Sequence, residues 1–92
     1  MTLLDTLKEA QKDAMRAKDK ATLKTLRMAL AAVKQREVDE RIELNDTDVL
    51  AILTKMVKQR NESITPFRAA GRQDLVDIEE AEIAVITKFL PQ

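Results

Sequence analysis

Glycine is almost missing from this chain of 92 residues, which contains a single one, Gly71, and two prolines, Pro66 and Pro91. A fold rich in β-strands needs many tight turns, and those turns depend heavily on glycine and proline. The apolar residues are mostly leucine, alanine, isoleucine, valine and methionine, and only two residues are aromatic. This set favours helices over strands. The chain is therefore predicted to be all-α.

Apolar residues recur at helical spacing in the first half of the chain. One helix is predicted to start after Thr2, with Asp5 completing a capping box, and a second to span about Lys20 to Arg41 behind the N-cap Asp19. The apolar stripe of the first comprises Leu3, Leu7, Ala10, Ala14 and Ala17, widened by Leu4 and Met15. That of the second comprises Leu23, Leu26, Leu30 and Val33.

Two further helices are predicted in the second half. One begins near Asp46 or Thr47, and the other spans about Gln73 to Phe89 with a cap near Asp74. The third helix has one apolar track that includes a charged residue: Val49, Leu53, Met56, Arg60, Ile64 and Phe67. The fourth has an inward row of Leu75, Ile78, Ala81, Val85 and Phe89 and a second row of Ile83, Ile86 and Leu90. So wide an apolar face suggests contact with two neighbours or with something missing from this chain, either a further C-terminal part or a second copy.

The segment from residue 55 to residue 75 joins the third and fourth helices. Gly71 is predicted to be the left-handed cap that ends the third helix. Pro66 lacks a backbone donor and crowds the carbonyl of Glu62. We therefore expect a kink near residues 63–65, or a new start with Thr65 as cap and Pro66 in the first helical position.

Charge is balanced overall but divided unevenly along the chain. Residues 1–36 carry nine basic and four acidic side chains, whereas residues 37–92 carry seven basic and twelve acidic ones. The chain has no cysteine, no secretory signal pattern and no apolar run of the roughly 20 residues that cross a bilayer. A soluble cytoplasmic protein without membrane contact is the expectation.

The residues that usually carry catalysis are scarce. Histidine and cysteine are absent, which excludes Ser–His and Cys–His nucleophiles and zinc sites with the common ligands. One glycine cannot build a phosphate-binding loop, and the only serine, Ser63, is expected on a helix surface. Nothing in the spacing of the carboxylates suggests a cleft that would shift their pKa values. We predict no catalytic residues, no cofactor and no metal site.

Basic residues near the end of the third helix admit two interpretations. They could pair with the acids of the fourth helix, or they could form a phosphate-binding patch with the basic edge of the second helix, which comprises Lys20, Lys24, Arg27, Lys34 and Arg41. The residues alone favour pairing. Recognition of single-stranded RNA by stacking is disfavoured, because Phe67 and Phe89 are expected in the core.

Several stretches resemble the YqeY-like proteins over essentially the whole chain. They are Arg27–Arg41 (RMALAAVKQREVDER), Lys58–Phe67, Ala70–Leu75, Ala81–Ile83 and Phe89–Gln92. The resemblance implies a four-helix N-terminal part, with the smaller C-terminal helical part of that family absent from this chain. It also implies a relation to the C-terminal tail of the B subunit of the glutamine-dependent tRNA amidotransferase (GatB). In that enzyme the tail engages tRNA.

The resulting prediction is one domain over residues 1–92, a small four-helix bundle in which sequence neighbours are antiparallel. Its leading function is a non-catalytic, tRNA-associated accessory module, with tRNA or a tRNA-handling enzyme as partner. The residues expected to bind nucleic acid are Arg27, Lys34, Arg36, Lys58, Arg60, Arg68 and Arg72. Arg60, on the apolar track, also suggests a structural ion pair with Glu37 or Glu82.

Two alternatives remain open at this stage. One is a protein-interaction bundle or homodimer formed through the apolar rows of the fourth helix. The other is an enzyme, because the label of the resembled family is a carbon–nitrogen ligase with glutamine as amido-N-donor. No catalytic constellation in the sequence supports that label.

Overall fold

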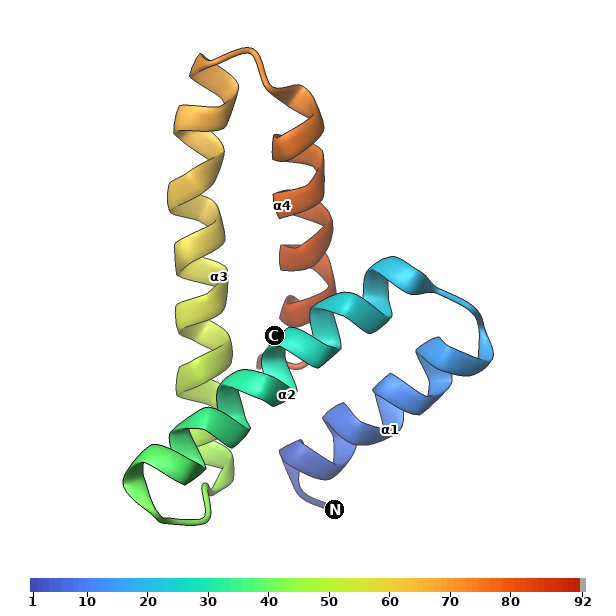
Figure 1. Ribbon diagram of the computed structural model, residues 1–92, viewed down its shortest axis with the longest axis vertical. Coiled ribbons are helices and arrows are strands. Elements are labelled where there is room, and N and C mark those ends of the chain that lie inside the picture. The colour runs from blue at the N-terminus through green and yellow to red at the C-terminus, as the bar shows by residue number, and fades with distance from the viewer. Residues whose placement is uncertain (92) are drawn as a thin grey trace.

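The structure, a computed structural model, describes residues 1–91. Those residues form four helices and no strand, which confirms the all-α prediction (Figure 1). The helices are α1 (Leu3–Arg16), α2 (Lys20–Glu40), α3 (Asp46–Ala69) and α4 (Gln73–Thr87).

The helices form two antiparallel hairpins that cross each other (Figure 1). The pair α1–α2 lies across the lower part of the pair α3–α4, and α2 contacts all of the other three helices. The loop end of α3–α4 projects beyond this crossing, and the molecule measures 41 × 31 × 26 Å. The expected antiparallel neighbours are present, and α2 is the central element of the fold.

The first three helices start at side-chain caps. Thr2 and Asp5 exchange hydrogen bonds in a capping box at α1, and Asn45 and Asp48 do the same at α3. At α2 the carboxylate of Asp19 accepts a hydrogen bond from the backbone N–H of Thr22. Each cap satisfies donors that the helix itself leaves unpaired. The caps predicted at Thr2 and Asp19 are confirmed.

Three residues with positive φ end the first three helices. Gly71 has φ +71°, and the N–H of Arg72 donates to the carbonyl of Phe67 in a Schellman motif. Lys18, with φ 57°, and Arg41, with φ 56°, take the same left-handed conformation without being glycine. The predicted role of Gly71 is confirmed.

Pro66 lies inside α3, and the helix is not restarted there. The helix runs unbroken from Asp46 to Ala69, so the prediction that Thr65 caps a new helix is wrong. Pro66 and Glu62 are both exposed, so water can reach the carbonyl of Glu62 that loses its intrahelical donor. The helix continues beyond Pro66, because the N–H of Ala70 donates to the Pro66 carbonyl.

The predicted ends of α4 need correction. Arg72, rather than Asp74, is the N-cap, and no side chain caps this helix. Asp74 lies in the first turn, where its carboxylate accepts two hydrogen bonds from the Arg72 guanidinium. At the other end α4 stops at Thr87 instead of Phe89, because the N–H of Phe89 donates to the Ile86 carbonyl, three residues back.

The core lies where the hairpins cross and draws on every helix. The predicted track of α3 faces inward throughout, and the stripe of α2 contributes Leu26 and Val33 as buried residues with Leu23 and Leu30 beside them. The buried residues of the cluster are Leu7, Ala14, Leu26, Ala29, Val33, Leu44, Val49, Leu53, Met56 and Ile86. The periodic spacing therefore identified the inward faces of α2 and α3.

The inward row predicted for α4 is confirmed in part, since Val85 and Phe89 pack against the core cluster. Ile78 is 49% exposed and Ala81 is exposed, whereas Val76 and Ile86 are buried. The covered residues come from both predicted rows, with Ile86 and Leu90 from the second, and Val76 belongs to neither row. In α1, Met15 is also exposed, at 54%, because α2 covers only one side of that helix.

The projecting end of the α3–α4 hairpin has its own small buried group. Ile64 and Val76 are buried but do not belong to the main core cluster. Between them and the main core along α3 and α4 stand Arg60 and Glu82, which are also buried. A buried ion pair thus separates the main core from the apolar residues near the loop.

Candidate nucleic-acid interface

Arg60 is the one predicted binding residue that lies inside the protein. Its Nε donates to Glu82 Oε1 at 2.8 Å, and its Nη1 donates to the carbonyl of Met56 at 3.1 Å. Both side chains of the pair are about 90% buried, with 10% and 11% exposed. The ion pair with Glu82, one of two suggested partners, is confirmed, and Arg60 is not available to a surface ligand.

Two further arginines at the α3–α4 loop end have acidic partners. Arg68 Nη2 lies 3.3 Å from Glu80 Oε1, across the hairpin, and Arg72 Nη2 lies 2.9 Å from Asp74 Oδ2. The hydrogen bond from the Arg72 side chain lowers the pKa of Asp74, and the same bond raises the pKa of Arg72. The preferred interpretation, in which acids of α4 pair with bases of α3, is confirmed by Arg60 and Arg68.

Arg36 is half-buried and also paired, within α2. Its Nε donates to Glu40, and this hydrogen bond is the main reason that the pKa of Arg36 is raised. A pair at spacing i, i+4 on a helix surface contributes a few tenths of a kcal/mol. Arg36 therefore keeps its charge, and its Nε donor is already engaged by Glu40.

The remaining predicted residues, Arg27, Lys34 and Lys58, are exposed and have no acidic partner within 4.0 Å among the described residues. Arg27 and Lys34 lie on one face of α2, seven residues apart. Lys58 lies on α3. The structure thus pairs four of the seven predicted residues with acids, Arg36 within α2 and Arg60, Arg68 and Arg72 in the α3–α4 hairpin, and leaves Arg27, Lys34 and Lys58 without such a partner.

Two more lysines extend the unpaired group of α2. Lys20, Lys24, Arg27 and Lys34 follow spacings of 4, 3 and 7, which return to the same helix face, and all four are exposed. With a rise of 1.5 Å per residue, they span about 21 Å. We call these four residues the α2 basic ridge. The spacing was already visible in the sequence, so Lys20 and Lys24 belonged in the predicted set.

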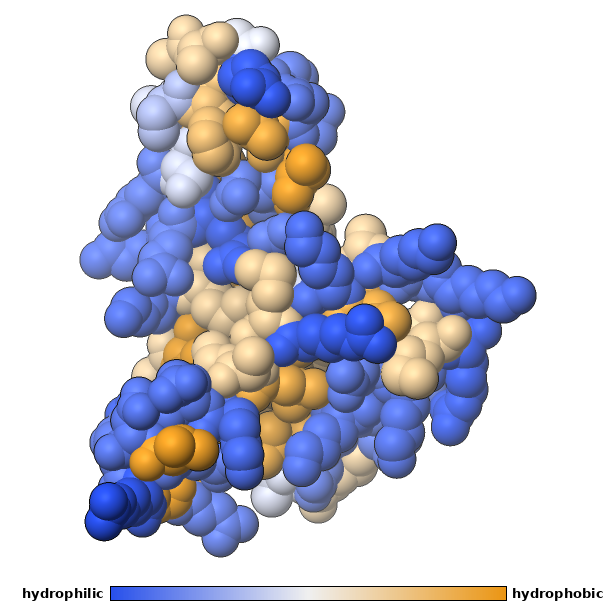
Figure 2. Space-filling model, in the orientation of Figure 1, coloured by the Kyte–Doolittle hydropathy of each residue, from blue (hydrophilic) through white to orange (hydrophobic). Residues whose placement is uncertain are grey.

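The side chains of the basic ridge are exposed along α2, which crosses in front of α3 in Figure 1. Figure 2 shows hydrophilic side chains projecting along the course of α2, around an apolar patch in the middle. Beside the ridge, a groove of about 440 Å³ between α1 and α2 is lined by Lys8, Lys12 and Lys34, together with Glu37. Lys12 pairs weakly with Glu9, at 3.6 Å. The side chains of α1 thus add positive charge next to the ridge.

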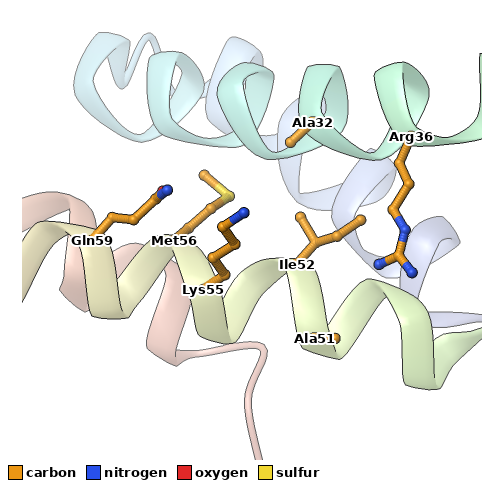
Figure 3. A pocket seen from close by; sticks show the side chains of 7 residues that line it. All are labelled: Ala32, Arg36, Ala51, Ile52, Lys55, Met56 and Gln59. Atoms are coloured by element: carbon orange, nitrogen blue, oxygen red, sulfur yellow. The ribbon is translucent and has the colours of Figure 1, made fainter. Parts of the chain in front are cut away.

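A second groove lies between α2 and α3. It has a volume of about 540 Å³, and Figure 3 shows its lining: Ala32, Arg36, Ala51, Ile52, Lys55, Met56 and Gln59. Ile52 is half-buried and Met56 is 7% exposed. Cations from both helices therefore flank an apolar floor.

Phe67 and Phe89 are both half-buried, and Phe89 packs against the core cluster. Neither is presented on the basic ridge, which belongs to α2. Within residues 1–91, no group of three or more acidic side chains is arranged to hold a metal ion.

The family assignment rests on a family profile described as "Yqey-like protein", which matches residues 4–92. This range is essentially the entire chain. The chain belongs to the YqeY-like family. The resemblance inferred from the α2 and α3–α4 segments is confirmed.

Relatives of this YqeY-like chain occur in fungi. It is 34% identical over 80 residues to an uncharacterized protein of Schizosaccharomyces pombe, covering 87% of this chain and 65% of that protein. It is 41% identical over 85 residues to the "Altered inheritance of mitochondria protein 41, mitochondrial" of Eremothecium gossypii, covering 91% of this chain and 46% of that one. The protein of the same name from Candida glabrata is 36% identical over 92 residues, covering 98% and 50%.

The YqeY-like chain thus spans about half to two thirds of the length of these relatives. In residues 1–91 no helix combines the length and hydropathy required to cross a membrane. Two of these relatives carry names that place them in mitochondria. The expected cytoplasmic location of this chain stays a prediction.

Proposed function

We propose that this chain is a non-catalytic accessory module that binds the phosphate backbone of RNA through the α2 basic ridge. The observation that carries the proposal is a row of four exposed cations on one helix face without acidic partners. Lys8, which lines the neighbouring groove together with Lys34 of the ridge, extends the positive surface onto α1.

The resemblance of the family to the tRNA-engaging tail of the amidotransferase B subunit supports tRNA as the RNA, and a tRNA-handling enzyme as its companion. Catalysis, including the amide transfer named in the family label, is assigned to other chains. We place the module in the cytoplasm, with the mitochondrion as the alternative that the names of the yeast relatives suggest.

Contact of this kind recognises shape and charge rather than base sequence. Lysine and arginine neutralise phosphates and release counterions, so affinity falls steeply as salt increases. Base edges are read by other contacts, in grooves or by stacking on aromatic side chains. The proposal therefore predicts strong salt dependence and little preference among tRNA sequences.

The test compares two triple variants with the same change in net charge. Lys24→Gln, Arg27→Gln and Lys34→Gln remove part of the ridge, whereas Arg16→Gln, Arg68→Gln and Arg72→Gln remove exposed cations that are paired with acids. Filter binding of tRNA is measured at low and moderate salt. We expect the ridge variant to lose most of its affinity for tRNA. The slope of log affinity against log salt concentration should become shallower by about 2, because each lost phosphate contact contributes roughly 0.7–0.9 to that slope.

The control variant is expected to retain binding within a factor of about three, because each removed cation already has a neighbouring carboxylate that opposes phosphate contact. Circular dichroism and thermal melts establish that both variants fold. Equal losses in the two variants would show that net charge alone matters, and they would contradict the ridge. Absence of salt-sensitive binding by the unmodified chain would overturn the whole proposal.

A second candidate function is self-association through α4, and the exposure of Ile78 favours it. Ile78, Ala81 and Val85 line a groove of about 410 Å³ against the N-terminal half of α2. Analytical ultracentrifugation would show a dimer that Ile78→Asp dissociates. A monomer at high protein concentration would exclude this function.

A further inference from the structure

We propose that the α2 basic ridge selects an unpaired strand of RNA, whose phosphates contact the cations while a base lies on an apolar floor between them. This inference rests on the proposed function and names the form of RNA that the ridge holds. A depression of about 630 Å³ on the exposed face of α2 carries it. All of its lining residues belong to α2: Lys20, Leu23, Lys24, Arg27, Met28 and Ala31.

The floor of the depression is apolar, although three cations surround it. Leu23 is half-buried and packs against the core cluster, so its position is fixed by the fold. Met28 is 38% exposed, and Ala31 is exposed. Figure 2 shows an apolar patch among the hydrophilic side chains along α2. Phosphate contact with the cations leaves this floor in water, so an occupant that covers it needs an apolar part as well as negative charge.

The cations of the depression are available to that charge. Lys20, Lys24 and Arg27 are exposed and have no acidic partner within 4.0 Å among the described residues. The lining contains no acid, and the adjacent Asp19 already accepts two hydrogen bonds from Thr22 in the α2 cap. Spacings of 4 and 3 residues place successive cations about 6 and 4.5 Å apart along the helix axis. A strand that runs along α2 therefore meets a cation at each turn.

A duplex cannot use the apolar floor. Its bases are stacked inside the double helix, and the major groove of double-stranded RNA is too deep and narrow for side chains to read. An unpaired base instead exposes its faces to the protein. Charge alone would favour the duplex, because two strands carry more phosphate per unit length than one. The apolar floor thus opposes the preference that the cations have by themselves.

Met28 and Arg27 supply contacts that aromatic side chains make in other RNA-binding surfaces. The thioether of Met28 is polarisable and makes favourable contacts with aromatic rings. The guanidinium of Arg27 is planar, so it can stack on a base as well as bind a phosphate. The small side chain of Ala31 leaves space beside them. In a folded RNA these contacts direct the ridge to loops and unpaired ends.

The test measures fluorescence anisotropy with three labelled RNAs of equal length: a single strand, the same strand annealed to its complement, and the same strand with abasic sites. We expect the single strand to bind at least about tenfold more tightly than the duplex and about fivefold more tightly than the abasic strand. Equal or tighter binding of either comparison RNA would overturn this inference and leave the proposed function in place. If no RNA binds in a salt-sensitive manner, the proposed function fails and the inference fails with it.

A substitution without charge change separates the floor from the cations. Met28→Gln removes the apolar contact and keeps a similar helix propensity. Its affinity for the single strand should fall about fivefold, whereas its affinity for the duplex and its salt slope stay unchanged, because no phosphate contact is lost.

The matched control is Met15→Gln, at a 54% exposed position of α1 that does not line the depression. This variant should bind both RNAs as the unmodified chain does. Unchanged binding of the single strand by Met28→Gln would contradict the proposal, as would equal losses for single strand and duplex or equal losses in the two variants.

Discussion

At the scale of single residues, the buried pair of Arg60 and Glu82 illustrates what a sequence can and cannot indicate. A charged residue on an apolar track needs a partner, because an unpaired charge is costly to bury. The track therefore suggested an ion pair for Arg60, and Glu82 was one of two suggested partners. The choice between Glu37 and Glu82 depends on where α4 packs against α3, and the spacing of apolar residues along a helix does not give that position. The same missing information left Ile78 on the wrong side of α4.

Removing one member of this pair should destabilise the protein strongly. Arg60→Met and Glu82→Leu, made singly, are each expected to cost about 3–5 kcal/mol, because the remaining charge stays buried. The double variant is expected to be as stable as the unmodified protein or more stable, by up to about 4 kcal/mol. Urea unfolding measures all three. If the two single losses add in the double variant, the pair does not act as a unit.

At the scale of helices and turns, predictions from local chemistry were accurate at the starts of α1 and α2 and failed at two places in the second half of the chain. Thr2 and Asp19 cap their helices by accepting hydrogen bonds from backbone N–H groups three residues later. Each cap therefore depends only on residues that are adjacent in the sequence. Asp74 was mistaken for a cap because Arg72, two residues earlier, engages its carboxylate. Pro66 was expected to kink the third helix or to start a new one behind Thr65, but α3 continues through it, because Pro66 is exposed and lies close to the helix end.

The left-handed residues that end α1 and α3 give opposite predictions. Lys18→Gly should stabilise the protein by about 0.5–1 kcal/mol, because relief of left-handed strain outweighs the added entropy of glycine in the unfolded chain. Gly71→Ala should destabilise it by about 1 kcal/mol through strain alone, since an added Cβ meets no atom within 4 Å. Urea midpoints at unchanged m values provide the measurement. Destabilisation by Lys18→Gly would contradict this account.

At the scale of the whole molecule, antiparallel neighbours were predictable and the crossing of the hairpins was not. Short connections bring consecutive helices side by side, so α1–α2 and α3–α4 follow from the element order. The angle between the pairs depends on how alanines such as Ala29 and Ala32 of α2 let the other helices approach. The radius of gyration of 13.9 Å exceeds the roughly 12 Å expected for a chain of this length. The projecting loop end accounts for this excess.

The projecting end should open without the rest of the protein. Native-state hydrogen exchange is expected to protect the amides of Ile64 and Val76 at least about tenfold less than those of Leu26 and Leu53. The first two lie beyond the buried ion pair, and the other two belong to the main core. Equal protection at all four amides would show that the hairpin end and the core open together.

The division into two hairpins also bears on how the chain reaches its native state. Each hairpin joins sequence neighbours, so the loops that must close are short and little entropy is lost before contacts form. Helical proteins with such local topology fold in microseconds to milliseconds. Docking of one hairpin on the other across α2 is then the step that involves distant parts of the chain. We infer that mutations in the inward face of α2 would slow folding, whereas those near Gly71 would mainly accelerate unfolding.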